Sequence, residues 1–91
     1  MTKADAINKV VGAVRMIQEM SGLPVGDLTE ATIPIGGVVG FDSLNGVEVA
    51  VIVGATNTRG LVNICVSDDG RRALSVGEIA DSLIRLVSTR G

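Results

Sequence analysis

The apolar residues of the first twenty positions recur at steps of three and four, and this spacing constrains the fold more than any other feature. They are Ile7, Val10, Val11, Val14 and Ile17. Such a stripe is typical of an amphipathic helix that packs one face against a core. Thr2 and Asp5 have the spacing of a capping box at its start, and Gly22 and Pro24 supply stop signals at its end. The pattern predicts a helix over 3–20.

A second amphipathic stripe lies near the other end of the sequence. Ser75 and Glu78 have the spacing of a capping box, and Leu74, just before the cap, can pack onto Ile79 inside the helix. The apolar positions are again three and four residues apart, namely Val76, Ile79, Ala80, Leu83 and Leu86 or Val87. The pattern predicts a packing helix over 76–88.

Residues 21–41 show no sustained hydrophobic period. Glycine and proline interrupt the segment at Gly22, Pro24, Gly26, Pro34, Gly36, Gly37 and Gly40. A long irregular segment is uncommon in a small domain unless it has a function or is pinned by its own side chains. We therefore expect a long loop whose apolar residues pack on the core, namely Leu23, Val25, Leu28, Ile33 and Ile35. The Gly36-Gly37 pair lacks the flanking pattern of a phosphate-binding loop.

The middle of the chain fits two structures. Residues 47–53, VEVAVIV, are rich in β-branched side chains, as in a buried strand. Leu44, Val47 and Val51 nevertheless have helical spacing behind Asp42, a favourable N-cap residue. Residues 61–66 pose the same choice, and we assign them to a loop or a short helix.

The amino-acid composition argues against several function classes. The 91 residues suffice for one small domain over 1–91, and the absence of histidine removes the commonest general base. The net charge is −2 and Phe41 is the only aromatic residue, which disfavours nucleic-acid binding. Cys65, the only cysteine, lies between Ile64 and Val66 and is interpreted as a buried apolar residue in a reducing compartment. We expect no independent enzyme.

Charged residues bear on export and on membrane insertion. Lys3, Asp5, Lys9, Arg15 and Glu19 interrupt any apolar core of a signal peptide. The most apolar run, 47–55, contains Glu48 and is far shorter than the ~20 residues that span a bilayer. We therefore expect a cytoplasmic protein without a membrane span.

Asp42, Ser43 and Leu44 lie within the segment GFDSLNGVEV, residues 40–49. This segment resembles the prosthetic-group attachment site of acyl and peptidyl carrier proteins. Residues 74–87, LSVGEIADSLIRLV, resemble the closing helix of the same family. The resemblance favours helix over strand for 43–56. It implies an all-α fold, a small bundle of three to four helices of the acyl-carrier-protein type with a long first loop.

The resemblance also implies a site and a set of partners. Ser43 would receive phosphopantetheine from coenzyme A through a separate phosphopantetheinyl transferase. Asp42 would cap the helix or help orient the magnesium-bound coenzyme A in that enzyme, and Leu44 would turn inward and lock the turn. The arm would then carry acyl or aminoacyl groups between acyl-activating, acyl-transferring or synthase enzymes. We expect the carrier to be a monomer.

The chain departs from the family pattern in its charges. Fatty-acid-synthesis carriers have a strongly acidic second helix, whereas Glu48 is the only acid between Ser43 and Ser67, so different partners are expected. The charged loop of Asp68, Asp69, Arg71 and Arg72 can take part in partner recognition, but a solvated turn is the favoured interpretation.

Three further apolar residues of the middle helix lie outside the Leu44–Val47–Val51 stripe, namely Val49, Ile52 and Val53. They would be buried against loops or form a docking patch.

Two alternatives from other classes stay open. A carrier-like fold can act without modification as an assembly or regulatory subunit, with Ser43 only part of a helix start. The chain can also be a small α/β ligand-binding module in which 47–53 and 61–66 are strands.

Overall fold

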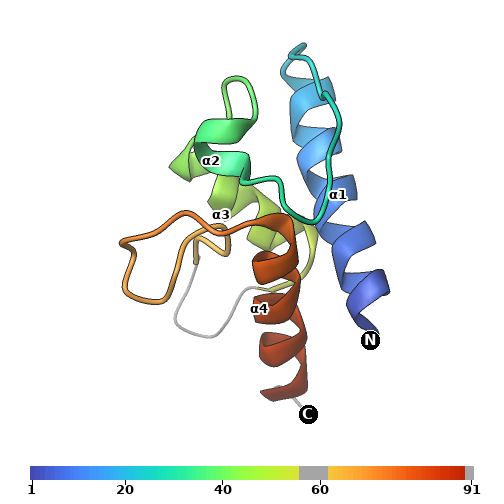
Figure 1. Ribbon diagram of the computed structural model, residues 1–91, viewed down its shortest axis with the longest axis vertical. Coiled ribbons are helices and arrows are strands. Elements are labelled where there is room, and N and C mark those ends of the chain that lie inside the picture. Colours follow the sequence, from blue (N-terminus) through green and yellow to red (C-terminus); the bar gives the residue numbers. More distant parts are fainter. Residues whose placement is uncertain (56–61, 90–91) are drawn as a thin grey trace.

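Helices dominate the fold (Figure 1). The computed structural model describes residues 1–55 and 62–89. Within this part of the chain there are four helices and no strand, namely α1 (Lys3–Met20), α2 (Pro34–Gly37), α3 (Ser43–Ile52) and α4 (Val76–Thr89). The prediction of a small all-α fold is confirmed, and the strand alternative for 47–53 is wrong because these residues lie in α3 and its C-terminal turn.

The long helices α1 and α4 begin at the capping boxes that the sequence predicts. The N–H of Asp5 donates to the Thr2 hydroxyl at 3.1 Å, and the N–H of Thr2 donates back to the Asp5 carboxylate. In α4 the N–H of Ser75 donates to Glu78 Oε1 at 3.0 Å, and the N–H of Glu78 donates to Ser75 Oγ at 3.2 Å. Reciprocal bonds of this kind satisfy N–H groups that have no partner inside a helix.

The core lies between α1, α3 and α4. The helices α1 and α4 pack along each other in opposite directions, and α3 packs against α1 (Figure 1). The centres of the apolar faces of α1 and α4 are buried, together with Phe41 and Leu74, whereas residues at the edges of these faces are half-buried, namely Ile7, Val11, Ile84 and Leu86, and Val87 is exposed. Leu74 and Ile79 share this core, as expected for a hydrophobic staple.

The first loop crosses the molecule and is tied to α4 by its backbone. Val76 donates its N–H to Thr32 O at 2.7 Å, and Gly77 donates to Glu30 O at 2.9 Å. Carbonyl groups of the loop thus satisfy two more N–H groups at the start of α4. The loop is not irregular throughout, because it contains the short α2 turn after Ile33.

Apolar pinning of this loop is only partly as predicted. Leu28 and Ile35 are half-buried and pack on the core, but Ile33 is 43% exposed. The residues that close the loop onto the core are instead Pro34, Val38 and Phe41, all of them buried. Pro34 starts the α2 turn, and this local bend selects which side chains face inward.

A polar side chain holds the two ends of the first loop together. Gln18, in the last turn of α1, is 1% exposed. Its Nε2 donates to Pro24 O at 3.0 Å and to Val39 O at 2.7 Å. The buried amide therefore binds both the start of the loop and Val39, which lies 21 residues after Gln18 in sequence.

The segment before α4 is a hairpin-like turn rather than a helix. Residues 62–75 contain no helix, and Val66 and Ala73 form an isolated antiparallel bridge. Ser67 Oγ donates to Asp69 at 2.6 Å and accepts the N–H of Arg72 at 3.1 Å. Of the loop or short helix expected for 61–66, residues 62–66 form the loop; the strand alternative is wrong for them, because only Val66 makes an isolated bridge, and residue 61 lies outside the described residues.

Candidate functional site

Ser43 is the first residue of α3 and is exposed. Asp42 is the N-cap, and its Oδ1 accepts the N–H of Asn45 at 3.2 Å. Asn45 Oδ1 accepts the N–H of Asp42 at 2.9 Å, which completes a capping box, and Asn45 Nδ2 donates to Glu48 at 2.8 Å. The cap and its neighbour hold the start of α3 in a defined geometry while leaving the serine side chain in solvent.

The Ser43 hydroxyl is accessible to solvent and to a reacting group. Within residues 1–55 and 62–89, it makes no hydrogen bond, and the N–H groups of Ser43 and Leu44 have no acceptor. Free N–H groups and the positive end of the helix dipole favour an anionic group at this position. The local geometry therefore suits a phosphate ester on the serine.

Leu44 does not turn inward as predicted. It is 69% exposed, and Val51, two turns further along the same face, is 53% exposed. The stripe of Leu44, Val47 and Val51 exists, but it lies on the outer side of α3. The residues that face the core are Gly46, Val49 and Ala50. Gly46 has no side chain, and the Asn63 carboxamide lies against the helix backbone at this position.

The apolar residues off that stripe have mixed environments. Val49 is fully buried, Val53 is half-buried and packs on the core, and Ile52 is 40% exposed. The core takes up Val49 and Val53, so the apolar surface that remains on α3 is formed chiefly by Leu44, Val51 and Ile52.

Asn63 is the functional neighbour that sequence reasoning missed. Its Nδ2 donates to Ser43 O at 3.0 Å, and its Oδ1 accepts the N–H of Cys65 at 3.0 Å. The second bond is an Asx turn, which the sequence favours because asparagine often bonds the backbone two residues on. The first bond is a long-range contact that no local pattern signals.

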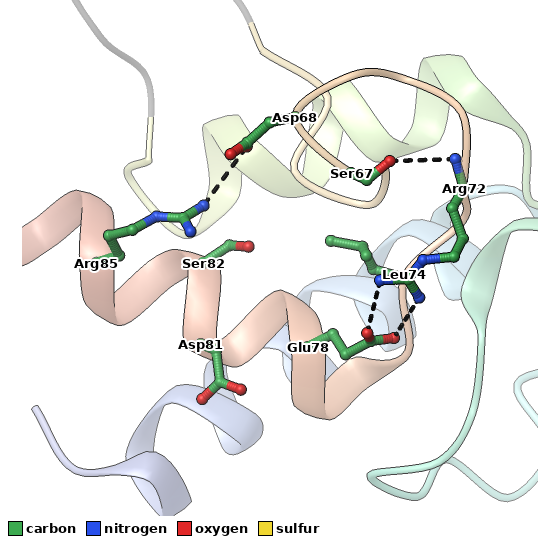
Figure 2. A pocket seen from close by; sticks show the side chains of 8 residues that line it. All are labelled: Ser67, Asp68, Arg72, Leu74, Glu78, Asp81, Ser82 and Arg85. Carbon is green, nitrogen blue, oxygen red and sulfur yellow. Dashed lines mark hydrogen bonds and ion pairs between the residues drawn. The ribbon is translucent and has the colours of Figure 1, made fainter.

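A charged groove lies between the hairpin-like turn and α4, with a volume of about 280 Å³ (Figure 2). Arg72 makes a two-pronged ion pair with Glu78, at 3.1 and 2.9 Å, and Arg85 approaches Asp68 at 3.5 Å. The Arg72 bond is the main cause that lowers the pKa of Glu78 to about 2, and the same pair raises the pKa of Arg72. These groups satisfy one another, so the groove offers no unpaired arginine at its floor.

Asp69 and Asp81 complete the charged surroundings of the groove. The Ser67 hydroxyl bond is the largest cause that lowers the pKa of Asp69. Asp81 pairs with Lys3 of α1 at 2.7 Å, and this pair links the two long helices. No group of three or more acidic or cysteine side chains within the described residues is arranged to hold a metal ion.

Cys65 is fully buried, and burial raises the pKa of its thiol to about 12. The prediction of a small buried residue is confirmed. A protonated thiol without solvent access is a poor nucleophile.

Comparisons with protein-family models, curated proteins and solved structures give no match to this chain. None of the helices in the described residues has the length and apolar character of a bilayer-spanning segment.

Proposed function

We propose that this protein is an acyl carrier protein whose Ser43 bears phosphopantetheine. The supporting observation is the exposed, unbonded hydroxyl of Ser43 at the capped start of a helix, next to free backbone N–H groups. The small helical fold and the long first loop agree with the resemblance of residues 40–49 to carrier attachment sites. Within the proposal the carrier is a cytoplasmic monomer.

The attachment step belongs to a separate transferase. The Ser43 oxygen attacks the phosphorus of coenzyme A that bears the pantetheine arm. A new P–O bond forms as the pyrophosphate bond breaks, and adenosine 3′,5′-bisphosphate leaves. The hydroxyl proton passes to a base of the transferase. Asp42 contributes one oxygen to the helix cap, and in the proposal its other oxygen helps to orient the transferase's magnesium-bound coenzyme A.

The carrier then works by tethering. When attached, phosphopantetheine supplies a terminal thiol that carries acyl or aminoacyl groups as thioesters. A flexible arm raises the effective concentration of its cargo at each docked enzyme. The partners are acyl-activating, acyl-transferring or synthase enzymes of fatty-acid, polyketide or related biosynthesis. The single carboxylate on α3, Glu48, is engaged with Asn45, which favours partners that do not rely on a basic docking patch.

Incubation with coenzyme A, magnesium and a broad-specificity phosphopantetheinyl transferase tests the proposal by intact mass. We expect the wild-type chain to gain one phosphopantetheinyl group and Ser43→Ala to gain none. Ser21→Ala, at the exposed end of α1, is a matched control that keeps the gain. An unmodified wild-type chain, in a reaction that modifies a known carrier, favours an unmodified assembly subunit instead. A mass gain that persists in Ser43→Ala rejects the assigned position.

A further inference from the structure

The Asn63 side chain joins the start of α3 to the buried core. Asn63 lies 20 residues after Ser43 in sequence, yet its Nδ2 donates to the Ser43 carbonyl at 3.0 Å. On its other side, Oδ1 accepts the N–H of Cys65, a residue with no exposed surface. One carboxamide thus bridges the exposed start of α3 and a buried part of the fold.

Gly46 makes this bridge possible. A Cβ atom at Gly46 would lie 2.7 Å from Asn63 Cγ and 2.9 Å from Asn63 Nδ2, and it would overlap Oδ1. The carboxamide therefore lies directly against the α3 backbone, one turn from Ser43. The carbonyl that it holds belongs to the Ser43–Leu44 peptide, so its position limits the rotation that aims the Ser43 side chain.

We propose that Asn63 is a positioning residue for the Ser43 hydroxyl. This inference rests on the proposed function, because the reaction that benefits is phosphopantetheine transfer. A transferase binds the serine turn in one geometry, and apparent affinity falls when only a fraction of the molecules has that geometry. Loss of the Asn63 bond is thus expected to raise the KM for the carrier and to leave kcat unchanged.

Asn63→Asp separates the two bonds of the bridge. The carboxylate keeps an acceptor for the Cys65 N–H but loses the donor to the Ser43 carbonyl. Asn63→Ala removes both bonds and serves as the second variant. Asn8→Asp, at an exposed position of α1, makes the same chemical change away from the site and is the matched control.

Transferase kinetics and backbone amide NMR spectra provide two independent measurements. For Asn63→Asp we expect the KM for the carrier to rise about fivefold, which is the factor that one ordinary hydrogen bond represents. The Leu44 amide signal shifts, while the Cys65 amide keeps its protection from hydrogen exchange, because the carboxylate still accepts its N–H. In Asn63→Ala the Leu44 signal shifts and the Cys65 amide loses that protection, and Asn8→Asp changes neither the spectra nor the kinetics. Circular dichroism of each variant under the assay conditions shows whether it is folded, and a folded variant that is only less stable changes neither kinetic constant.

The outcomes distinguish this inference from the proposed function. If the wild-type chain is modified and Asn63→Asp is modified with the same KM, the positioning role is rejected and the carrier function stands. If the wild-type chain is not modified at all, the carrier function is rejected. In that case, an unshifted Leu44 signal in Asn63→Asp also rejects the bridge itself.

Discussion

Gly46→Ala tests whether α3 is held by its contact with Asn63. Inside an exposed helix, replacing glycine by alanine stabilises a protein by about 1 kcal/mol, because alanine loses less backbone entropy. At Gly46 the new methyl group meets all three terminal atoms of the Asn63 carboxamide. The carboxamide must shift, and we expect this shift to break both of its hydrogen bonds.

The two losses outweigh the gain in helix propensity. The bond to the Ser43 carbonyl contributes about 1 kcal/mol, since water can replace the donor there. The Cys65 N–H is left without an acceptor in the buried core, which costs about 1–3 kcal/mol. The net expectation for Gly46→Ala is a fall in the free energy of unfolding of about 1–3 kcal/mol.

Two further variants test whether the clash with Asn63 causes the loss of stability in Gly46→Ala. In an Asn63→Ala background the obstacle is gone, so Gly46→Ala is expected to stabilise by about 1 kcal/mol. Gly12→Ala is the matched control, because Gly12 lies in α1 with no atom within 4 Å of an added Cβ, and it should also stabilise by about 1 kcal/mol. Urea unfolding followed by far-ultraviolet circular dichroism gives each value, as the chain has no tryptophan or tyrosine for fluorescence. If Gly46→Ala stabilises the wild-type chain as much as Gly12→Ala does, the Asn63 carboxamide is not held against the α3 backbone.

Three further expectations concern Gln18, Glu78 and Cys65. Gln18→Met should lower the free energy of unfolding by about 1–2 kcal/mol and speed amide hydrogen exchange in residues 21–41, because the amide that joins the loop ends is removed; unchanged exchange contradicts this role. The pKa of Glu78 is about 2 in the folded state, below the ordinary value of 4.5. Its contribution to stability is therefore complete above pH 4.5 and is lost as the pH falls towards 2, and Glu78→Gln should flatten the pH dependence of unfolding over that window. Cys65 should resist iodoacetamide at pH 8 and react on addition of urea, since its thiol is buried with a pKa of about 12; alkylation of the folded protein at the rate of a free thiol contradicts its burial.

The helices were predictable where their ends carry local chemistry. Thr2 and Ser75, the cap residues of the two capping boxes, lie immediately before the observed first residues of α1 and α4. The predicted end of the middle helix at residue 56 was too late, because α3 ends at Ile52. Gly54 adopts a φ of +74°, and the N–H of Ala55 donates to Ala50 O. This is a Schellman motif, and a glycine two residues after the last helical residue is its sequence signal.

The rotation of α3 about its own axis was not predictable from its sequence. Periodicity identified Leu44, Val47 and Val51 as one face, but β-branched residues occupy the other faces as well. Apolar spacing therefore could not say which face is buried. In the structure the face of Gly46, Val49 and Ala50 is buried, and the absence of a side chain at Gly46 lets Asn63 approach the helix backbone there.

Some residues of the candidate site were predictable from their neighbours in sequence, and others depend on contacts with distant residues. Asp42 and Ser43 are where the sequence places them, because the N-cap and the residue after it are defined by a few neighbouring residues. Gln18 and Asn63 were missed because each bonds carbonyl groups about twenty residues away. From the sequence alone, a glutamine in an amphipathic helix is interpreted as solvent-exposed. Only the fold shows that backbone carbonyl groups lie within hydrogen-bond distance of the buried Gln18 amide.

The helix that carries Ser43 depends on the rest of the fold more than α1 or α4 does. Its β-branched residues have weak helix propensity, and at ten residues it is too short to be stable alone. Its two ends are fixed by the Asp42 capping box and the Gly54 turn, while Asn63 ties its first residue to the core. The Ser43 hydroxyl is exposed, yet the position of the Ser43 backbone is fixed by a contact with a residue distant in sequence. The geometry of the start of α3 therefore depends on the integrity of the whole domain, and under the proposed function a short peptide containing residues 40–49 should be a much poorer transferase substrate than the folded chain.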